Sequence, residues 1–395
     1  MKLIHPFLFL LLIVGCQQEQ PASDPDAGLN FAVKQTQHML DTLSVLQKDR
    51  LPKSVDKSGR MTQSDIYDWT SGFFPGSLWY LYEFNKNDSL KQRAVRWTEL
   101  LKPLQFFSGH HDVGFMVNCS YGNAYRITGD TAYRSIMIQT AKSLMKRYNP
   151  KVGAILSWDA DKGWQKEKGW KYPVIIDNMM NLELLFKASQ YTGDSIFYKA
   201  AVSHADKTLK HHFRPDYSSY HVVDYDPQSG QALHHQTAQG YADSSAWARG
   251  QAWGLYAYTF CYRETGLKRY LEQAEHIADF ILQHPHLPAD KIPYWDFDAP
   301  DIPNTYRDAS AAAIIASALV DLAKETKGEA SINYRQTAET IVKNLSNSPY
   351  RAALGTNQGF ILKHSVGSLP HQNEIDVPLA YADYYYIEAL MKLRK

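Results

Sequence analysis

The stretch Tyr125-Arg-Ile-Thr-Gly129-Asp-Thr-Ala-Tyr133 is one of several similar joints between helical segments. Tyr191-Thr-Gly193-Asp-Ser-Ile-Phe-Tyr198 and Tyr262-Arg-Glu-Thr-Gly266-Leu-Lys-Arg-Tyr270 follow the same plan, and Lys324-Glu-Thr-Lys-Gly328 is a weaker copy. Glycine suits the left-handed conformation that ends a helix, and Asp or Ser suits the N-cap of the next helix. The joints recur every 60–75 residues or so, which predicts an array of helical hairpins.

Apolar residues recur at three- and four-residue steps on both sides of these joints, which predicts amphipathic helices. The helical segments span residues 30–48, 73–84, 89–104, 114–127, 131–148, 177–192, 195–212, 244–264, 268–284, 308–326, 330–347 and 376–394. No convincing alternation typical of strands interrupts them. We therefore expect an all-α fold, an (α/α)6 barrel of six helical hairpins. An open solenoid is the alternative, but it needs polar capping repeats and neither end shows one.

The connections between the hairpins are longer than the joints and richer in His, Asp, Trp and Pro. They span residues 50–72, 105–113, 149–176, 213–243, 285–307 and 348–375. Long loops gathered at one end of a rigid scaffold commonly carry function. We expect the functional site at this end of the barrel.

Composition describes a folded globular protein. The chain has 395 residues, 44% hydrophobic and 21% charged, with a formal net charge of +1. This near-neutral balance argues against a nucleic-acid-binding protein, which normally carries a basic surface. The aromatic content of 13% suits a polar cleft as well as a core.

The N-terminal segment has the layout of a secretory signal. Lys2 precedes an apolar run that is too short to span a bilayer, and residues 12–16 (LIVGC) resemble a bacterial lipobox. We interpret residues 1–15 as a lipoprotein signal peptide, Cys16 as the lipidated residue and residues 16–28 as a flexible tether. Residues 29–395 then form a single barrel domain. The predicted location is the periplasm, and the lipid anchor in the outer membrane is the one expected membrane attachment. An ordinary signal peptide is the alternative.

No motif for a cofactor or metal stands out. The chain has no GxGxxG before a helix, no Walker loop, no HExxH and no Cys/His cluster at zinc spacing. We expect neither a metal nor a cofactor. Cys119 and Cys261 lie in apolar helical stretches, which predicts buried free thiols rather than a disulfide.

Two carboxylates are candidates for catalysis. Asp112 (in HHDVGF, 110–115) and Asp177 (in IIDNMMNLELL, 175–185) each stand at the start of a helix after a long loop. Each alone could be an ordinary N-cap. Together they could project into one cleft, where apolar flanks and mutual repulsion would raise the pKa of Asp177 and the helix N-terminus would lower it. If burial and repulsion dominate, one Asp is a protonated acid while the other stays charged.

A third cluster combines aromatic, amide and guanidinium groups between Thr237 and Trp253. Arg offers a fork for a carboxylate or a diol, and Trp offers a flat wall for a sugar ring. The alternative is core packing with a structural ion pair. The candidates here and in other loops are Trp69, His221, Thr237, Gln239, Trp247, Arg249 and Trp253.

Together these motifs resemble the unsaturated glucuronyl hydrolases, glycoside hydrolase family 88. The resemblance covers nearly all of the mature chain and rests on DWTSGFFPG (68–76), HHDVGF (110–115), IIDNMMNLELL (175–185), SSAWARGQAW (244–253) and EIDVPLAYADYYYIEAL (374–390). It implies an (α/α)6 barrel, which agrees with the hairpin pattern. It also implies an enzyme that needs no metal and removes the 4,5-unsaturated uronic acid that polysaccharide lyases leave at the non-reducing end of oligosaccharides.

The resemblance further implies a mechanism by hydration of the C4=C5 double bond. Asp177 matches the general acid/base and Asp112 its partner. The seven residues of the third group match positions that line the uronate subsite, and His111 and Trp158 match more loosely. In HSVGSLP (364–370), Ser365 and Ser368 match a loop that in some relatives contacts the next sugar or its sulfate, but Pro370 replaces a Lys there. This chain therefore departs from the family pattern for that sulfate contact. It also has Ala238 where family members often carry a His next to the Gln.

Three alternatives remain at this stage. An unsaturated rhamnogalacturonyl hydrolase would share the fold and the reaction. A non-catalytic carbohydrate-binding lipoprotein would use the aromatic residues and Arg249 without needing paired acids. A hydrolase of ordinary glycosidic bonds would act on saturated oligosaccharides. The parent polysaccharide, whether ulvan, a glycosaminoglycan or another chain, and the oligomeric state are open.

Overall fold

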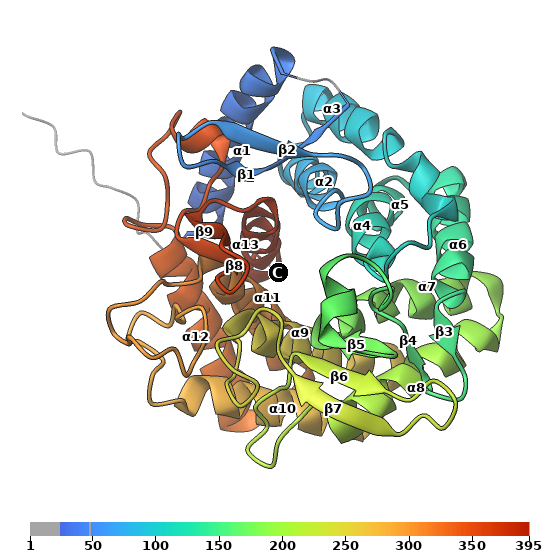
Figure 1. Ribbon diagram of the computed structural model, residues 1–395. Coiled ribbons are helices and arrows are strands. Elements are labelled where there is room, and N and C mark those ends of the chain that lie inside the picture. Colours follow the sequence, from blue (N-terminus) through green and yellow to red (C-terminus); the bar gives the residue numbers. More distant parts are fainter. Residues whose placement is uncertain (1–23, 47–48, 395) are drawn as a thin grey trace, which may run out of the picture.

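The computed structural model describes residues 24–46 and 49–394, and in these ranges the helices form two concentric rings (Figure 1). The inner ring contains α2 (Phe73–Asn85), α4 (Val113–Val117) with α5 (Asn123–Thr128), α7 (Leu182–Thr192), α9 (Ala248–Thr265), α11 (Ala309–Glu325) and α13 (Ala380–Leu393). The outer ring contains α1 (Pro25–Ser44), α3 (Asp88–Glu99), α6 (Thr131–Met145), α8 (Ser195–His211), α10 (Lys268–Gln283) and α12 (Gly328–Leu345).

The ring is closed by the two ends of the described chain. The α13 helix packs against α11 on one side and α2 on the other, and α1 covers it from outside. Five hairpins are sequential, and the sixth pairs the first helix with the last. The (α/α)6 barrel predicted from the sequence is therefore confirmed, and the open solenoid is excluded.

The glycine joints have the predicted conformation. Gly129, Gly193 and Gly266 end α5, α7 and α9 with φ angles of 71°, 73° and 68°. The side chains of Asp130 and Asp194 each accept a 2.9 Å hydrogen bond from the amide two residues later, which caps the next helix. The weaker copy differs, because α11 is capped at Thr326 rather than at Gly328.

The tether prediction is wrong for its last residues. The α1 helix begins at Pro25, and Asp24 caps it by accepting a 2.9 Å hydrogen bond from the Asp26 amide. Asp at the N-cap followed by Pro at the first helical position is a favoured start, so residues 25–28 belong to the barrel. The signal peptide, Cys16 and residues 16–23 lie outside the described residues.

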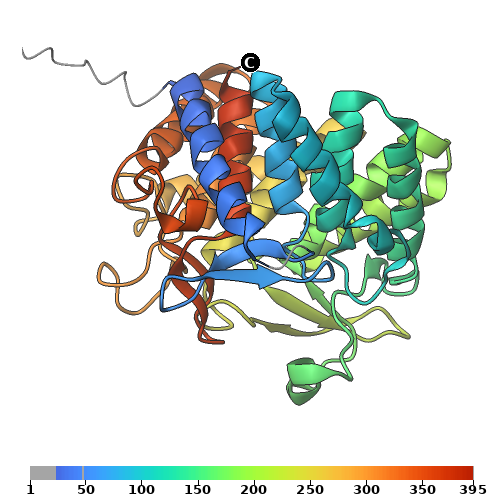
Figure 2. The same ribbon diagram turned by 90° about the horizontal axis from the view of Figure 1, so that it is seen from above.

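The prediction of no strands is also wrong, because the long loops contain short antiparallel pairs. These are β1 (Leu51–Val55) with β2 (Met61–Ser64), β3 (Tyr148–Asn149) with β4 (Ala154–Ile155), β5 (Pro173–Ile175) with β6 (Val222–Tyr225) and β7 (Ala232–Gln236), and β8 (Ser365–Ser368) with β9 (Asn373–Val377). Strands this short carry too little alternation to be read from sequence. Figure 2 shows them gathered at one end of the helices.

Candidate helices elsewhere match closely, with two informative differences. The segment predicted at 114–127 consists of α4 and α5 joined by a π-helical turn, Asn118–Gly122. The segment predicted from 177 opens with a 3-10 helix, Ile176–Asn181, before α7 begins. Both irregular turns lie close to a predicted catalytic Asp. No helix in the described ranges combines the length and hydrophobicity that crossing a membrane requires.

Candidate active site

Asp112 and Asp177 both lie at the strand-bearing end of the barrel, where the long loops meet the inner helices. Asp112 occupies the N-cap position of α4, but its side chain makes no capping hydrogen bond. Asp177 lies in the 3-10 helix before α7, and that helix is not capped by a side chain either. Neither side chain therefore caps a helix, and both carboxyl groups are free of a capping hydrogen bond.

The Asp177 carboxyl group is buried and incompletely bonded. The residue is 9% exposed, and its Oδ2 atom has no hydrogen-bond partner. Burial raises the pKa of Asp177 to about 7, the Arg249 guanidinium opposes this, and the nearby Asp112 carboxylate adds to it. A carboxyl group with this pKa is substantially protonated near neutral pH and can act as a proton donor.

His221 faces the unbonded oxygen of Asp177. Its Nε2 atom lies 3.7 Å from Asp177 Oδ2. Its Nδ1 atom accepts hydrogen bonds from the backbone amides of Ala238 (3.0 Å) and Gln239 (3.2 Å), which places the ring proton on Nε2. Burial lowers the pKa of His221 well below 6.5, so the ring is a neutral donor directed at the acid.

Asp112 has the opposite environment. Two histidines flank it, with His110 Nδ1 3.2 Å from Oδ2 and His111 Nε2 3.3 Å from Oδ1. Burial opposes ionisation, but the interactions with His111, His110 and Arg147 outweigh it and lower the pKa of Asp112. Asp112 is therefore ionised when Asp177 is protonated, which is the division of roles expected of an acid and its charged partner.

Local packing holds the two acidic segments together. Asn181, at the end of the 3-10 helix of Asp177, accepts a 2.8 Å hydrogen bond from the Phe115 amide in α4. Its amide nitrogen lies 3.3 Å from His111 Nδ1. One side chain thus fixes the start of α4 relative to the Asp177 turn, and the electrostatic effect of Asp112 on Asp177 follows from this proximity.

Two half-buried tryptophans form the open part of the site. Trp69 and Trp158 line one cavity with Asp112, His110 and Lys162, and this cavity has a volume of about 450 Å³. Behind Trp158, Trp170 stacks at 5.9 Å between ring centroids with an interplanar angle of 22°. Flat apolar walls beside a carboxylate suit a sugar ring with charged or hydroxyl groups.

Further predicted residues connect this wall to the acids. His111 lies 6.5 Å from Trp158 between ring centroids, Trp158 lies 6.1 Å from His221, and His221 lies 4.7 Å from Trp247. The Arg249 guanidinium then covers the Trp247 ring at 4.4 Å. Residues far apart in sequence therefore form one continuous cluster around Asp177.

Thr237 and Gln239 lie half-buried on the loop after β7. Thr237 Oγ1 accepts a 2.8 Å hydrogen bond from the Gly240 amide, which shapes the turn. Gln239 Oε1 accepts a 2.9 Å hydrogen bond from Arg249 Nη2. The loop therefore places the Gln239 side chain beside Arg249, and its backbone amides fix the His221 ring by hydrogen bonds.

The hydrogen bonds of Arg249 are made mainly to other groups of the protein. Its Nη2 atom donates to the Gly367 carbonyl at 2.6 Å, and its Nη1 atom donates to the Val366 carbonyl and lies 3.4 Å from Asp308. It is 2% exposed. Its contribution to the site is therefore a fixed positive charge near Asp177 and an anchor for β8.

Several residues predicted to contact substrate lie behind the lining. His111, Trp253 and Ser365 are each fully buried. Packing leaves no exposed surface on these three residues in this structure, and their role in substrate binding stays a prediction. His111 pairs with Asp112, Trp253 packs against Phe115 and Tyr385, and Ser365 lies in the strand whose carbonyls hold Arg249.

Trp247, His221 and Ser368 are also buried, with exposures of 3%, 2% and 6%. Ser368 Oγ lies 2.8 Å from His371 Nδ1 on the adjoining turn. A role for Ser368 at the next sugar stays a prediction.

Sequence reasoning missed some residues of the site. Asn181 and Tyr381 lie in motifs that were recognised, but nothing in the pattern separated them from core positions. Tyr381 packs 4.8 Å from Trp69 and 5.4 Å from the Arg249 guanidinium. Trp164 lies 5.2 Å from Trp158 and 5.0 Å from His371, so it joins two loops across the site. The signal for Trp164 was the density of Trp in residues 158–170.

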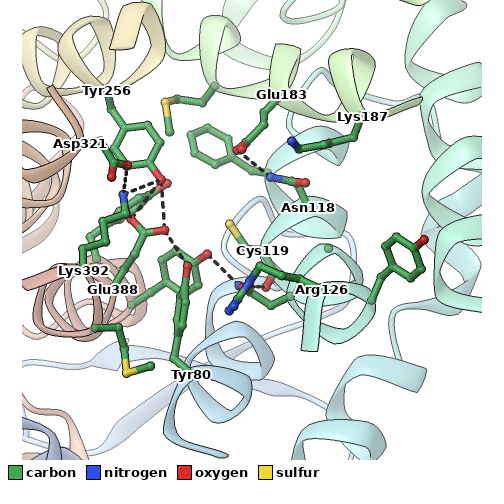
Figure 3. A pocket seen from close by; sticks show the side chains of 18 of the residues that line it. Tyr80, Asn118, Cys119, Arg126, Glu183, Lys187, Tyr256, Asp321, Glu388 and Lys392 are labelled. Carbon is green, nitrogen blue, oxygen red and sulfur yellow. Dashed lines mark hydrogen bonds and ion pairs between the residues drawn. The ribbon is translucent and has the colours of Figure 1, made fainter. Parts of the chain in front are cut away.

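A second cavity of about 460 Å³ lies toward the hairpin-joint end of the inner helices (Figure 3). Its lining is charged, but the charges pair with one another. Lys392 Nζ lies 2.7 Å from Asp321 and 3.1 Å from Glu388, and Arg263 lies 2.9 Å from Glu183. Cys119, which lines this cavity, and Cys261 are buried free thiols, as predicted.

Comparison with known proteins shows the family to which this chain belongs. Residues 44–389 match the model of Glycosyl Hydrolase Family 88. The chain belongs to this family. It is therefore a glycoside hydrolase.

Relatives within family 88 are similar over most of their length. An unsaturated glucuronyl hydrolase of Formosa agariphila is 45% identical over 327 residues, 82% of this chain and 80% of the relative. One from Bacillus sp. strain GL1 is 35% identical over 356 residues, 88% of this chain and 92% of the relative. A crystal structure of an unsaturated glucuronyl hydrolase specific for heparin has 49% identity and a TM-score of 0.88, covering 93% of this chain and 96% of that one.

Proposed function

We propose that this protein is an unsaturated glucuronyl hydrolase that removes the 4,5-unsaturated uronic acid from the non-reducing end of lyase-generated oligosaccharides. Family membership and the names of the relatives support this activity. The observation that carries the mechanism is the pKa of about 7 of Asp177, a buried carboxyl group beside an ionised Asp112.

The reaction is hydration of a vinyl ether. Protonated Asp177 donates its proton to C4 of the unsaturated ring, and positive charge develops at C5 and the ring oxygen. The Asp177 carboxylate then accepts a proton from the water that adds to C5. The resulting hemiketal opens and releases the remaining saccharide. The proton returns to Asp177, so the cycle consumes one water and no other reactant.

Each neighbouring residue has a defined task in this mechanism. Ionised Asp112 keeps the pKa of Asp177 high and offers an acceptor to the sugar hydroxyls. Neutral His221, whose Nε2 lies 3.7 Å from Asp177 Oδ2, is near enough to move into hydrogen-bond distance and stabilise the carboxylate that forms after proton transfer. Trp69 and Trp158 hold the ring that bears the double bond.

The test is to supply lyase-generated disaccharides to the purified protein and follow the ultraviolet absorbance of the double bond. We expect the absorbance to decay while a saturated disaccharide of the same composition is not cleaved. Cleavage of the saturated sugar would identify an ordinary glycosidase instead. Binding without decay for every lyase product would favour a carbohydrate-binding protein.

For the parent polysaccharide we propose a glycosaminoglycan. A relative with 49% identity is described as specific for heparin, and others are named unsaturated chondroitin disaccharide hydrolases. The decisive comparison sets unsaturated heparin and chondroitin disaccharides against ulvan- and rhamnogalacturonan-derived ones at equal concentration. A higher kcat/KM for either of the last two would overturn the glycosaminoglycan proposal and leave the reaction intact.

We also propose that the protein is a periplasmic lipoprotein anchored through Cys16, on the basis of the apolar run and the LIVGC sequence at residues 12–16. Metabolic labelling with a fatty acid analogue should label the wild-type protein in a bacterial host and not Cys16→Ser. An unlabelled wild type that is released in soluble form would contradict the anchor.

A further inference from the structure

A group of metal-ligating side chains lies on the loop between α10 and α11, apart from the acid pair. His284, His286 and Asp298 each offer a ligand atom, and these atoms all lie within 4.8 Å of one another. The mechanism above uses none of the three.

Hydrogen bonds already orient two of these side chains for coordination. His286 Nδ1 lies 2.7 Å from the Phe297 carbonyl, so this nitrogen is the donor and Nε2 keeps its lone pair. Asp298 Oδ2 accepts a 2.9 Å hydrogen bond from the Ala246 amide, which leaves Oδ1 available. Metal-binding His and Asp residues typically use their second nitrogen or oxygen, the one that does not bind the metal, in hydrogen bonds of this kind. The His nitrogen donates to a carbonyl, and the Asp oxygen accepts from an N–H group.

His284 needs a small adjustment. Its Nδ1 atom accepts a 3.2 Å hydrogen bond from the His286 amide. A cation bound at Nδ1 would replace this long contact, whereas binding through Nε2 would require a change of tautomer. The cost is one weak hydrogen bond, which is small beside the energy of a metal–imidazole bond.

We propose that His284, His286 and Asp298 bind one divalent transition-metal cation of the zinc type. Two imidazoles and one carboxylate suit Zn²⁺ and its Co²⁺ and Ni²⁺ analogues, whereas Mg²⁺ and Ca²⁺ prefer oxygen ligands alone. His286 and Asp298 are exposed, so water completes the coordination.

The position of this site indicates a structural role. The Phe297 amide donates to the Ala246 carbonyl at 2.9 Å, and the Ala248 amide donates to the Trp295 carbonyl at 3.2 Å. Asp296 accepts hydrogen bonds from the Tyr241 amide (2.8 Å) and the Ser245 hydroxyl (2.7 Å). The loop thus holds the segment that leads into Trp247 and α9, and a bound cation would fasten the loop to the end of α10.

The expectation of no metal rested on motif spacing. His284-Pro-His286 is a short pair, and Asp298 lies in a different turn of the same loop. Only the path of the chain around Phe297 brings the third ligand to the pair. A search for contiguous metal motifs therefore does not find it.

The experiment is a Co²⁺ titration of tag-free, EDTA-treated full-length protein, followed by calorimetry and visible absorption. We expect one saturable Co²⁺ per chain, at least tenfold weaker binding in His284→Ala/His286→Ala, and unchanged binding in the matched control His234→Ala/His235→Ala. That control removes two exposed imidazoles from β7. Equal affinity in the two double variants, or no saturable binding by the wild type, would overturn the proposal.

A second variant guards against misfolding. Asp298→Asn keeps an oxygen acceptor for the Ala246 amide but loses the charge that a cation needs, so we expect binding at least tenfold weaker than in the wild type. Zn²⁺ should also raise the Tm of the wild type, with saturation at one equivalent, and leave the Tm of Asp298→Asn unchanged. Identical Tm increases in the two proteins would contradict the assignment even if the double variant does not fold.

Discussion

The two ends of the barrel each bury a carboxyl group among aromatic side chains, but the hydrogen bonding of the two groups differs. At the hairpin-joint end, Glu388 accepts hydrogen bonds from Tyr80 (2.7 Å) and Tyr256 (3.0 Å) and pairs with Lys392 at 3.1 Å (Figure 3). The Ser317 hydroxyl also donates to it. At the loop end, Asp177 Oδ2 has no donor. Similar burial therefore accompanies a fully hydrogen-bonded carboxyl group at one end and an incompletely bonded carboxyl group with a raised pKa at the other.

A raised pKa alone does not mark the functional end. Burial also raises the pKa of Asp383 to about 7. Both of its oxygens, however, accept backbone hydrogen bonds, from Ile361 at 2.8 Å and Leu362 at 2.9 Å. Asp177 differs because it has a second acid beside it and an unbonded oxygen facing His221. The combination of these features is the basis for proposing Asp177 as the catalytic acid.

The largest expected effect is the loss of activity in Asp177→Asn. The amide has no proton to give to C4, so we expect kcat to fall by about 10²–10⁴-fold. Following the absorbance decay of an unsaturated disaccharide measures this. A kcat close to that of the wild type would show that Asp177 is not the proton donor, and the loop end would then not differ in function from the hairpin-joint end.

The same variant should be more stable than the wild type at neutral pH. The folded-state pKa of Asp177 is raised from 3.8 to about 7, so the folded protein loses stability as the pH rises between these values and keeps that deficit above them. Asp177→Asn should therefore gain up to about 4 kcal/mol at pH 7. Urea unfolding at several pH values measures this gain, which should vanish near pH 4; a lower stability at pH 7 would contradict it.

Glu388→Gln should have the reverse profile. The substitution weakens the interactions of the Glu388 carboxyl group with its four donors. It should therefore lower the free energy of unfolding by about 1.5–3 kcal/mol. Since Glu388 lies at the other end of the barrel, kcat per folded molecule should stay within about twofold. Comparing activity with the folded fraction from circular dichroism tests this, and a selective fall in kcat would link the two ends.

The smallest expected effect concerns the pH profile. The kcat/KM of the wild type should fall as the pH rises through about 7, because Asp177 loses its proton there. Asp112→Asn removes the neighbouring negative charge and should therefore lower the pKa of Asp177. The fall in the remaining activity at high pH should then occur about one pH unit lower than in the wild type. An unmoved limb would show that Asp112 does not set the pKa of Asp177.

The sequence was sufficient for the barrel because its signals are local. Helix periodicity and a glycine with positive φ depend on neighbouring residues, so the joints at Gly129, Gly193 and Gly266 could be read directly. The cap at Asp24-Pro25 was equally local and was overlooked when residues 16–28 were interpreted as a tether. The strand pairs were missed because each strand is at most five residues long.

For the site, the sequence supplied Asp112, Asp177 and the aromatic residues, but it could not sort them. Trp69 and Trp158 line the cavity, whereas Trp253 and Ser365 are buried behind it. Exposure depends on which loops cover a residue, and those loops are joined by contacts such as Trp164 with His371. No spacing along the chain encodes such contacts.

Sequence alone therefore determined the repeating hairpin and the residue types available for acid chemistry, since both follow from short-range pattern. Tertiary structure alone decided that α1 closes the ring against α13, that Asp177 holds its proton while Asp112 does not, and that Asp298 reaches His284 and His286. The physical reason is that closure, desolvation and coordination all depend on distances between residues that are far apart in the chain.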